Sequence, residues 1–342
     1  MTTLDVQQVR TTAPELYGDF WFNSEPVLLS SLRGRAALVV FWDYTSRSCE
    51  HVLLYVGEWH RKYMEFGFVV VAVHTPRFPF GKNPACVQEA IDRLRIEFPV
   101  VMDNESLVWS RYGTRVWPTV YLIDGSGHIR HQNTGEGNYH ATEHAVQSML
   151  YESGIGEELP VIMQPLREAD RPGAVCYRST PELFAGYLRG SIGNVEGCVP
   201  ESAIDYEDPQ IYFQGRFYAD GTWLNERDSL RFAGAGSNRS GQIILNYQGC
   251  EANAVMDPDS GSLEVTVKQD NQYLTDENKG EDVRIDEDGR SFVLVDSPRL
   301  YHVARNREYG EHNLRLAAAT SGWAMYSLSF VSDVIPEPVS NN

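Results

Sequence analysis

Apolar residues in the first half of the chain form runs and stripes that alternate. Three continuous runs rich in β-branched and aromatic residues predict buried strands, because a strand covered on both faces is apolar throughout. Between these runs, apolar positions recur at the spacing of one helix face. We expect strands at residues 36–42, 68–73 and 119–123, and helices at 50–66, 84–96 and 142–151. Strands alternating with helices predict an α/β layer fold.

The second half of the chain has a different pattern of apolar and polar residues. From about residue 180 the helical spacing nearly disappears, and short alternating segments recur between Gly, Asp, Asn and Ser turns. This pattern is typical of an all-β sandwich or jelly roll. Glycines and prolines between the halves predict a linker. The predicted organisation is an α/β domain at residues 1–155, a linker at 156–180, an all-β sandwich domain at 181–335 and a tail at 336–342.

Charge and composition narrow the function. The chain has 342 residues and a formal net charge of −18, of which residues 151–342 carry −15. We expect no nucleic-acid partner, because such a partner needs a basic face. No apolar run approaches the roughly 20 residues of a membrane-spanning helix, and the polar start lacks the features of a signal peptide. These features predict a cytoplasmic protein with no membrane partner.

The strongest candidate for chemistry lies where the first buried strand ends. Phe41 and Trp42 close this strand, a short loop follows, and Cys49 falls in the first turn of the next predicted helix. Much later, Trp117 and Pro118 stand at the head of another buried strand. A proline at that place needs a special reason, and a cis-proline turn is one. Together these two segments predict a thioredoxin-like active site.

Several motifs in a fixed order extend this prediction to most of the chain. The segments at 13–15 and 32–35 resemble TlpA/ResA-type thioredoxin-like proteins of the AhpC/TSA-like superfamily. Others resemble the thioredoxin and C-terminal domains of DipZ-type proteins. The resemblance implies a thioredoxin fold followed by a carbohydrate-binding-module-like β-sandwich. The DipZ-like segments lie at 74–76, 82–85, 116–124, 129–131, 135–139, 142–143, 179–183 and 322–330.

One position departs from the family. Its members carry Tyr-x-Cys-x-x-Cys after the Phe-Trp pair, whereas this chain has Tyr44, Ser46 and Cys49 at the three defined positions. Ser46 therefore replaces the nucleophilic cysteine. Exchange between two thiols needs an attacking thiolate and a resolving thiol, and a serine hydroxyl forms no disulfide. A standard dithiol mechanism at this pair is excluded.

Single-thiol chemistry is one function left open. A cysteine in the first turn of a helix is favoured as thiolate, Ser46 suits the N-cap, and Arg47 adds a cation. The Ser-x-x-Cys spacing also resembles that of peroxiredoxins, which implies thiol-disulfide or peroxide chemistry through Cys49. Cys86 is the candidate resolving thiol, and Trp42 stands where peroxiredoxins carry a proline. The partners would be a protein or small thiol, or a peroxide.

A catalytically silent binding module is the alternative. The second cysteine of a thioredoxin pair is usually poorly exposed, so Cys49 can be a packing residue. A groove at the cis-proline offers backbone groups to an extended peptide or protein segment, and this binding can outlast the chemistry. We expect no cofactor in either case. The predicted groove comprises Trp42, Tyr44, Arg47, Trp117, Pro118, Thr119 and Glu136.

Three further clusters of residues could carry a function, but each is more typical of an ordinary structural role. Four histidines with Glu136 and Glu143 suggest a metal site, yet they flank a predicted hairpin and helix start, so no metal is expected. Acidic turns at 257–261 and 286–289 resemble generic turns more than a calcium site. Five aromatic residues of the second half could bind a glycan but are more typical of a core. The histidines are His128, His131, His140 and His144, and the aromatic residues are Tyr212, Tyr218, Trp223, Tyr247 and Trp323.

Overall fold

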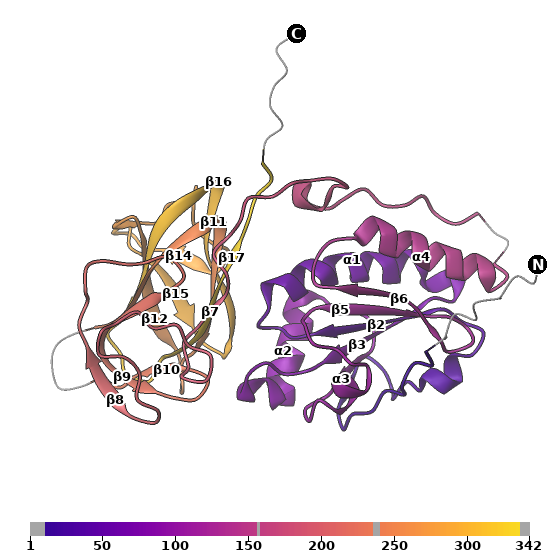
Figure 1. The fold of residues 1–342 in the computed structure, drawn as a ribbon, viewed down its shortest axis with the longest axis horizontal. Helices are drawn as coiled ribbons and strands as arrows, with labels where there is room; N and C mark the ends of the chain where they lie inside the picture. Colours follow the sequence, from indigo (N-terminus) through magenta and orange to yellow (C-terminus); the bar gives the residue numbers. More distant parts are fainter. Residues whose placement is uncertain (1–10, 156–157, 235–239, 336–342) are drawn as a thin grey trace, which may run out of the picture. The chain divides into compact units, whose positions relative to one another are not determined.

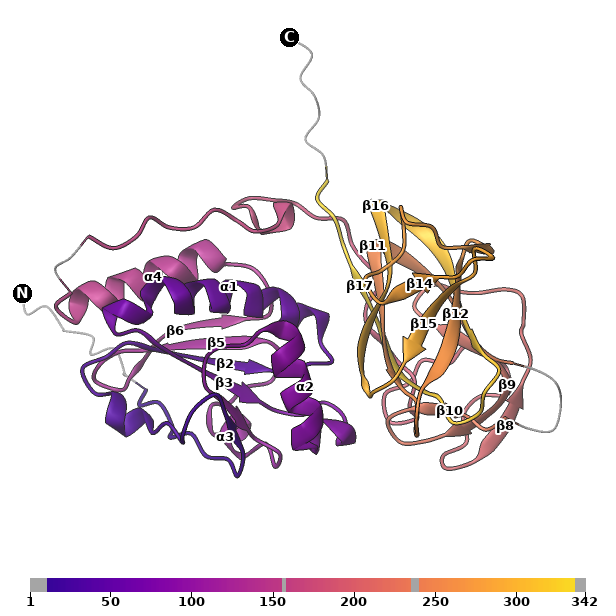
Figure 2. The same cartoon turned by 180° about the vertical axis from the view of Figure 1, so that it is seen from behind.

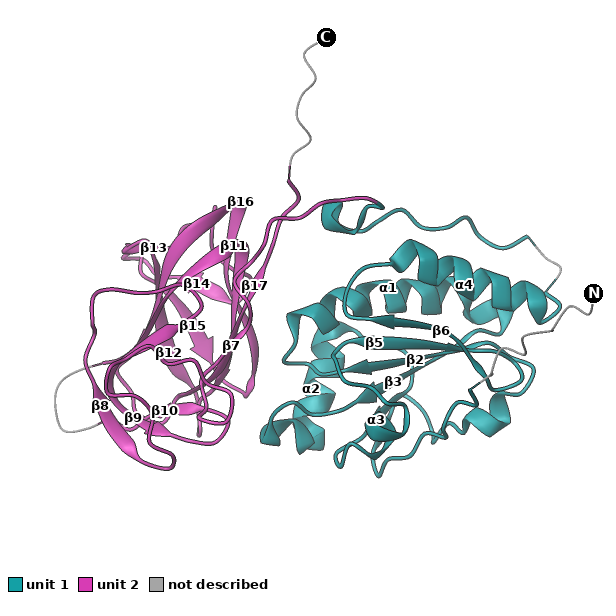
Figure 3. Ribbon diagram, viewed as in Figure 1, with its two compact units in different colours: residues 1–172 teal, residues 173–342 magenta. Residues whose placement is uncertain are grey.

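Figure 1 shows the computed structural model, which describes residues 11–155, 158–234 and 240–335. The chain divides into two compact units, residues 1–172 and 173–342 (Figure 3). Each has its own hydrophobic core. Among the described helices, none combines the length and the apolar character that crossing a bilayer requires.

A six-stranded mixed sheet forms the centre of the first unit. Its order is β1-β4-β3-β2-β5-β6, with β2, β3 and β4 parallel and β5 antiparallel to β2. Every residue of β2 and β5 is buried, which explains why both strands are continuously apolar. The strands are β1 (Trp21–Phe22), β2 (Ala37–Trp42), β3 (Val69–His74), β4 (Val100–Met102), β5 (Thr119–Ile123) and β6 (Ile129–Thr134).

Helices cover both faces of this sheet. Helices α1, α2 and α4 share one core with Leu38, Val40 and Trp42 of β2, whereas α3 packs against the alternate residues of that strand. The same separation is visible in Figure 1 and, from behind, in Figure 2, where α1 and α4 run along one side of the sheet and α3 lies on the other. The helices are α1 (Arg47–Tyr63), α2 (Pro84–Leu94), α3 (Leu107–Arg111) and α4 (Tyr139–Glu152), with 3-10 turns at Leu29–Leu32, Met64–Phe66, Pro79–Lys82 and Glu168–Asp170.

The second unit is all-β, as predicted. Its described strands pair into one connected sheet of eleven strands, and every pairing is antiparallel. Because β9 pairs with both β10 and β11, the sheet curls back on itself and becomes barrel-like. The strands are β7 (Leu183–Phe184), β8 (Ala203–Tyr206), β9 (Phe217–Asn225), β10 (Leu230–Phe232), β11 (Gly241–Asp257), β12 (Leu263–Gln269), β13 (Gln272–Tyr273), β14 (Val283–Ile285), β15 (Ser291–Val295), β16 (Arg299–Ala318) and β17 (Ala324–Val331).

The aromatic residues considered for a glycan platform are mostly core. Tyr218, Trp223, Tyr247 and Trp323 are buried, and the rings of Trp223 and Trp323 meet edge to face at 5.1 Å. The platform hypothesis is therefore wrong for these four residues, because a buried ring cannot stack on an external sugar. Tyr212 is half-buried and donates a hydrogen bond to Asp208 at 2.7 Å.

Candidate functional site

The site is built where β2 passes into α1. Trp42 ends the strand, and Ser46 takes the extended backbone of an N-cap residue, with φ −112° and ψ 115°. Ser46 is therefore the N-cap residue, as predicted, but its hydroxyl makes no capping hydrogen bond. The Ser46 side chain instead hydrogen-bonds the Cys49 thiol. The serine and the cysteine thus lie together in the first turn, at the places that the motif predicts.

Cys49 is a buried thiol. Its side chain is 0% exposed, and its Sγ accepts a hydrogen bond from the backbone N–H of Asp43 at 3.5 Å. Burial raises the pKa of Cys49 to about 12, and the hydrogen bond from Ser46 only partly offsets that rise. The expected activation by the helix N-terminus is therefore wrong, because desolvation of the thiolate outweighs it. Arg47 is paired with Glu50 at 2.8 Å.

Asp43 is a central residue that the sequence reasoning missed. Its carboxylate is fully buried and accepts hydrogen bonds from the backbone N–H of Thr45 at 2.7 Å and of Arg77 at 2.9 Å. The hydroxyl of Thr45 donates to it as well. The negative charge of Asp43 adds to the rise in the Cys49 pKa, whereas Arg77 lowers that pKa. An acidic residue directly after the Phe-Trp strand end was the available signal.

The side chains of Trp42 and Tyr44 are buried and do not line a groove. Both are at most 1% exposed, which corrects their predicted placement at the substrate groove. The ring of His74 packs between them, stacked on Tyr44 at 5.4 Å and edge-on to Trp42 at 5.2 Å. Burial lowers the pKa of His74, although the nearby Asp43 opposes this. The imidazole Nε2 lies 3.5 Å from the carboxylate of Asp43.

Cys86 is the second thiol of this region. It lies in the first turn of α2 and is partly exposed, and burial together with Cys86 raises the pKa of Tyr44. Neither Cys86 nor Cys49 forms a disulfide. The role of Cys86 as a resolving thiol stays a prediction.

The predicted proline turn joins α3 to β5. The Trp117–Pro118 peptide bond is cis, and the indole N–H of Trp117 donates to the carbonyl of Thr75 at 3.0 Å. Thr119 is buried and donates its hydroxyl to the Val116 carbonyl at 2.7 Å. Within the described ranges, the backbone N–H and carbonyl of Trp117 bond no other backbone group. Val116, immediately before, is exposed.

Glu136 sits on a loop tied to this turn, because Gly135 donates its N–H to the Pro118 carbonyl at 2.8 Å. Its carboxylate contacts Nδ1 of His51 at 2.8 Å and the guanidinium of Arg167 at 2.7 Å. Burial alone would raise the pKa of Glu136, but His51, Arg167 and the side chain of Ser48 together lower it to about 2. Sequence reasoning missed Arg167, because the glycines and prolines around it indicated a linker.

The histidines considered for a metal site have other neighbours. His140 and His144 are exposed and face each other with ring centroids 4.5 Å apart, whereas His131 hydrogen-bonds Thr142 at 3.1 Å. In the part of the chain that the structure describes, no three His, Cys, Asp or Glu side chains converge as metal ligands.

The α/β unit, with Ser46 and Cys49 opening α1 and a cis-proline before β5, defines a thioredoxin-like domain. Comparison with known families agrees: residues 9–132 match the AhpC/TSA family, and residues 180–330 match the thioredoxin-like C-terminal domain family. The chain thus carries an AhpC/TSA-type domain followed by a thioredoxin-like C-terminal domain.

Curated relatives include protein DipZ of Mycobacterium tuberculosis, which is 32% identical over 271 residues. That match covers 77% of this chain but 37% of DipZ, so the chain spans little more than a third of that relative. YkuV of Bacillus subtilis, named a thiol-disulfide oxidoreductase, is 26% identical over 43% of this chain and 99% of its own. Among solved structures, a thiol-disulfide isomerase from Corynebacterium glutamicum is 25% identical, with a TM-score of 0.37, over 40% of this chain and 96% of its own.

Proposed function

We propose that the first unit is a thioredoxin-fold binding module, which holds an extended segment of a partner protein at Trp117 and Pro118 without turning it over. One observation carries this proposal: the thiol of Cys49 is fully buried and has a pKa raised to about 12. Ser46 meanwhile occupies the place of the family's nucleophile.

Thiol chemistry at Cys49 would need a supply of thiolate. Burial raises the pKa of Cys49 to about 12, so the thiol stays protonated at neutral pH. Only the thiolate attacks a disulfide or a peroxide, and attack also needs access to the sulfur. Cys49 lacks both properties, and Ser46 cannot replace it. Binding therefore fits this geometry better than exchange.

The backbone just before β5 offers groups that can bind an extended peptide. The N–H and carbonyl of Trp117 are free of backbone partners in the described residues, so they suit pairing with an added strand. Val116 offers exposed apolar surface beside them, and Glu136 stands on the adjoining loop. An extended peptide with an apolar side chain opposite Val116 matches these groups.

Single-thiol chemistry remains the second candidate, because the relatives YkuV and ResA are named thiol-disulfide oxidoreductases. In that reading Cys49 attacks the disulfide or peroxide, Ser46 donates a hydrogen bond to its sulfur, and Cys86 or an external thiol resolves the product.

Two measurements separate the candidates. Disulfide reduction and peroxide consumption are compared for wild type, Cys49→Ser and Ser46→Cys; we expect wild type and Cys49→Ser to stay equally at background. Wild-type turnover that Cys49→Ser removes would overturn the proposal.

Peptide binding is measured on an array of extended peptides, where Val116→Asp should lose binding while Leu54→Asp, at an exposed site on α1, should keep it. An array without wild-type binders would refute the binding role.

A further inference from the structure

Residues 158–171 run back along α4 and α1 as an extended segment, with one 3-10 turn near its end (Figure 1). Four side chains of the two helices bind its backbone in place of strand partners. Gln147 donates to the Pro160 carbonyl at 2.6 Å, and Lys62 donates to the Val161 carbonyl. Glu143 accepts from the Met163 N–H at 3.1 Å, and Tyr55 from the Leu166 N–H at 2.7 Å.

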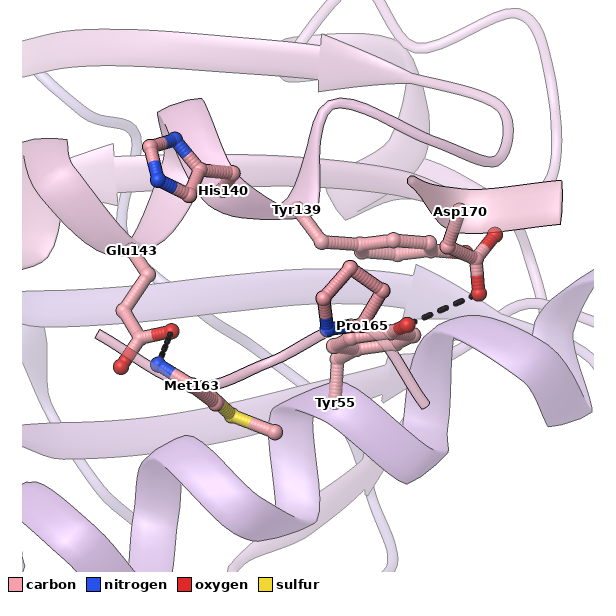
Figure 4. Close-up of a pocket in the computed structure, with 7 residues that line it drawn as sticks. All are labelled: Tyr55, Tyr139, His140, Glu143, Met163, Pro165 and Asp170. Atoms are coloured by element: carbon pink, nitrogen blue, oxygen red, sulfur yellow. Dashed lines mark hydrogen bonds between the residues drawn. The ribbon is translucent and has the colours of Figure 1, made fainter. Parts of the chain in front are cut away.

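The groups that receive this segment are themselves fixed. Glu143 is buried and also accepts the hydroxyl of Tyr63 at 2.7 Å. The ring of Tyr55 stacks on Tyr139 at 3.7 Å, and its hydroxyl donates to Asp170 at 2.8 Å, as drawn in Figure 4. The recess that these residues line has room for about one water molecule. A solvated linker needs no such receptor, so the contacts indicate a docked element.

Arg167 connects this segment to the proline turn. Its guanidinium binds Glu136 at 2.7 Å and forms two hydrogen bonds with Asp170, at 2.7 and 2.8 Å. It also contacts Nδ1 of His51, which lies on α1 half a turn beyond Cys49. One side chain thus joins the segment, the first helix and the loop that bonds Pro118.

We propose that residues 158–171 act as a strap that fixes the loop at residues 135–137 beside the groove, with Arg167 as the positioning residue. The loop needs such support, because Gly135 and Gly137 flank Glu136 with φ of +79° and +89° and pack against nothing where a Cβ would stand. The side-chain amide of Asn133 donates to the carbonyls of Gly135 and Gly137, at 3.3 and 3.0 Å. The guanidinium of Arg167 donates to the carboxylate of Glu136. The effect on peptide affinity rests on the proposed function; the effect on the loop does not.

Hydrogen exchange in the full chain tests the strap. In Arg167→Met, amide exchange at residues 135–138 should rise by about tenfold or more, because the loop loses its charged anchor. Arg171→Met is the matched control: Arg171 lies in the same segment, is exposed and pairs with Glu168, so loop exchange should stay at the wild-type rate. Unchanged loop exchange in Arg167→Met would overturn the proposal. Glu136→Gln, which removes the other partner's charge, should loosen the loop in the same way and guards against misfolding of a single variant.

Peptide affinity tests whether the strap also affects binding at the groove. Arg167→Met should weaken binding of a wild-type array peptide by about five- to tenfold, whereas Arg171→Met should not weaken it. Faster loop exchange with unchanged affinity would overturn the coupling between strap and groove. If wild type binds no peptide, the proposed function fails, while the exchange result still decides whether the strap fixes the loop.

Discussion

At the level of single residues, burial decides the chemistry of the site more than the position in a helix does. The motif predicts that Cys49 opens α1 beside Ser46, and both residues lie there. The sequence did not predict that Trp42 and Tyr44 close over the site or that Asp43 is buried with them. Solvent access depends on packing between distant segments, here with His74 of β3, which spacing along the chain does not encode.

The charge of Asp43 should be measurable at Cys49. In Asp43→Asn the pKa of Cys49 should fall, because a negative neighbour is removed, but should stay above about 9, because burial remains the largest cause of the rise. The lost carboxylate bonds to Thr45 and Arg77 should lower the free energy of unfolding by about 1–3 kcal/mol. The measurement is thiolate absorbance against pH, with Cys49→Ser as the blank. Asp19→Asn, at an exposed site, should leave the curve in place; an unchanged curve for Asp43→Asn would contradict the assignment.

Glu136 should make the stability of the first unit depend on pH. Its pKa is lowered to about 2 in the folded chain from an ordinary value of 4.5, so the unfolded chain binds the proton more readily. The stabilisation is therefore complete above about pH 4.5 and is lost as the pH falls through about 2. Denaturation of wild type and Glu136→Gln should show a difference at pH 7 that shrinks on acidification. The exposed Glu168 supplies the control variant Glu168→Gln, and a constant difference would argue against this linkage.

At the level of elements, long periodic segments were predictable and short or irregular ones were not. The predicted helices over 50–66, 84–96 and 142–151 correspond to α1, α2 and α4. β1 and β4 have two and three residues, too few to show a period. The long strands β11 and β16 have a register irregularity between Gly249 and Glu251, and such a bulge interrupts the alternation that marks a strand in the sequence.

Two glycines in different elements should respond oppositely to alanine. A Cβ at Gly280 would stand 2.1 Å from the backbone carbonyl oxygen of His302 in β16, so Gly280→Ala should destabilise the second unit by about 2–4 kcal/mol. Gly57 lies inside α1, where an added Cβ meets only the flexible end of Arg61 at 3.7 Å. Gly57→Ala should stabilise the first unit by about 0.5–1 kcal/mol. Denaturant midpoints, followed by a probe in each unit, would show both signs, and a neutral Gly280→Ala would contradict the packing.

At the level of the whole molecule, the sequence predicted an α/β domain and an all-β domain, but not that the segment after α4 belongs to the first of them. The described part of the expected linker, residues 158–171, is held by buried side chains of α1 and α4 and falls within the compact unit of residues 1–172. Glycine and proline content reports where regular structure stops. It carries no information about side chains in other elements that bind an extended backbone, so the sequence predicted a linker at this segment.

Truncation should show where the first unit ends. A chain of residues 1–155 leaves the carboxylate of Glu143 without the Met163 N–H and the hydroxyl of Tyr55 without Leu166 and Asp170, and it uncovers the apolar surface under Leu159. Each lost hydrogen bond contributes about 0.5–3 kcal/mol, and the uncovered apolar surface adds to the loss, so this chain should be less stable than residues 1–172 by several kcal/mol. Thermal and denaturant unfolding of the two truncated chains measures the difference, with the full chain as reference. Within residues 1–172, the double variant Glu143→Gln with Tyr55→Phe should reproduce part of the loss. Equal stability of the two truncated chains would mean that the strap rests on the unit without supporting it.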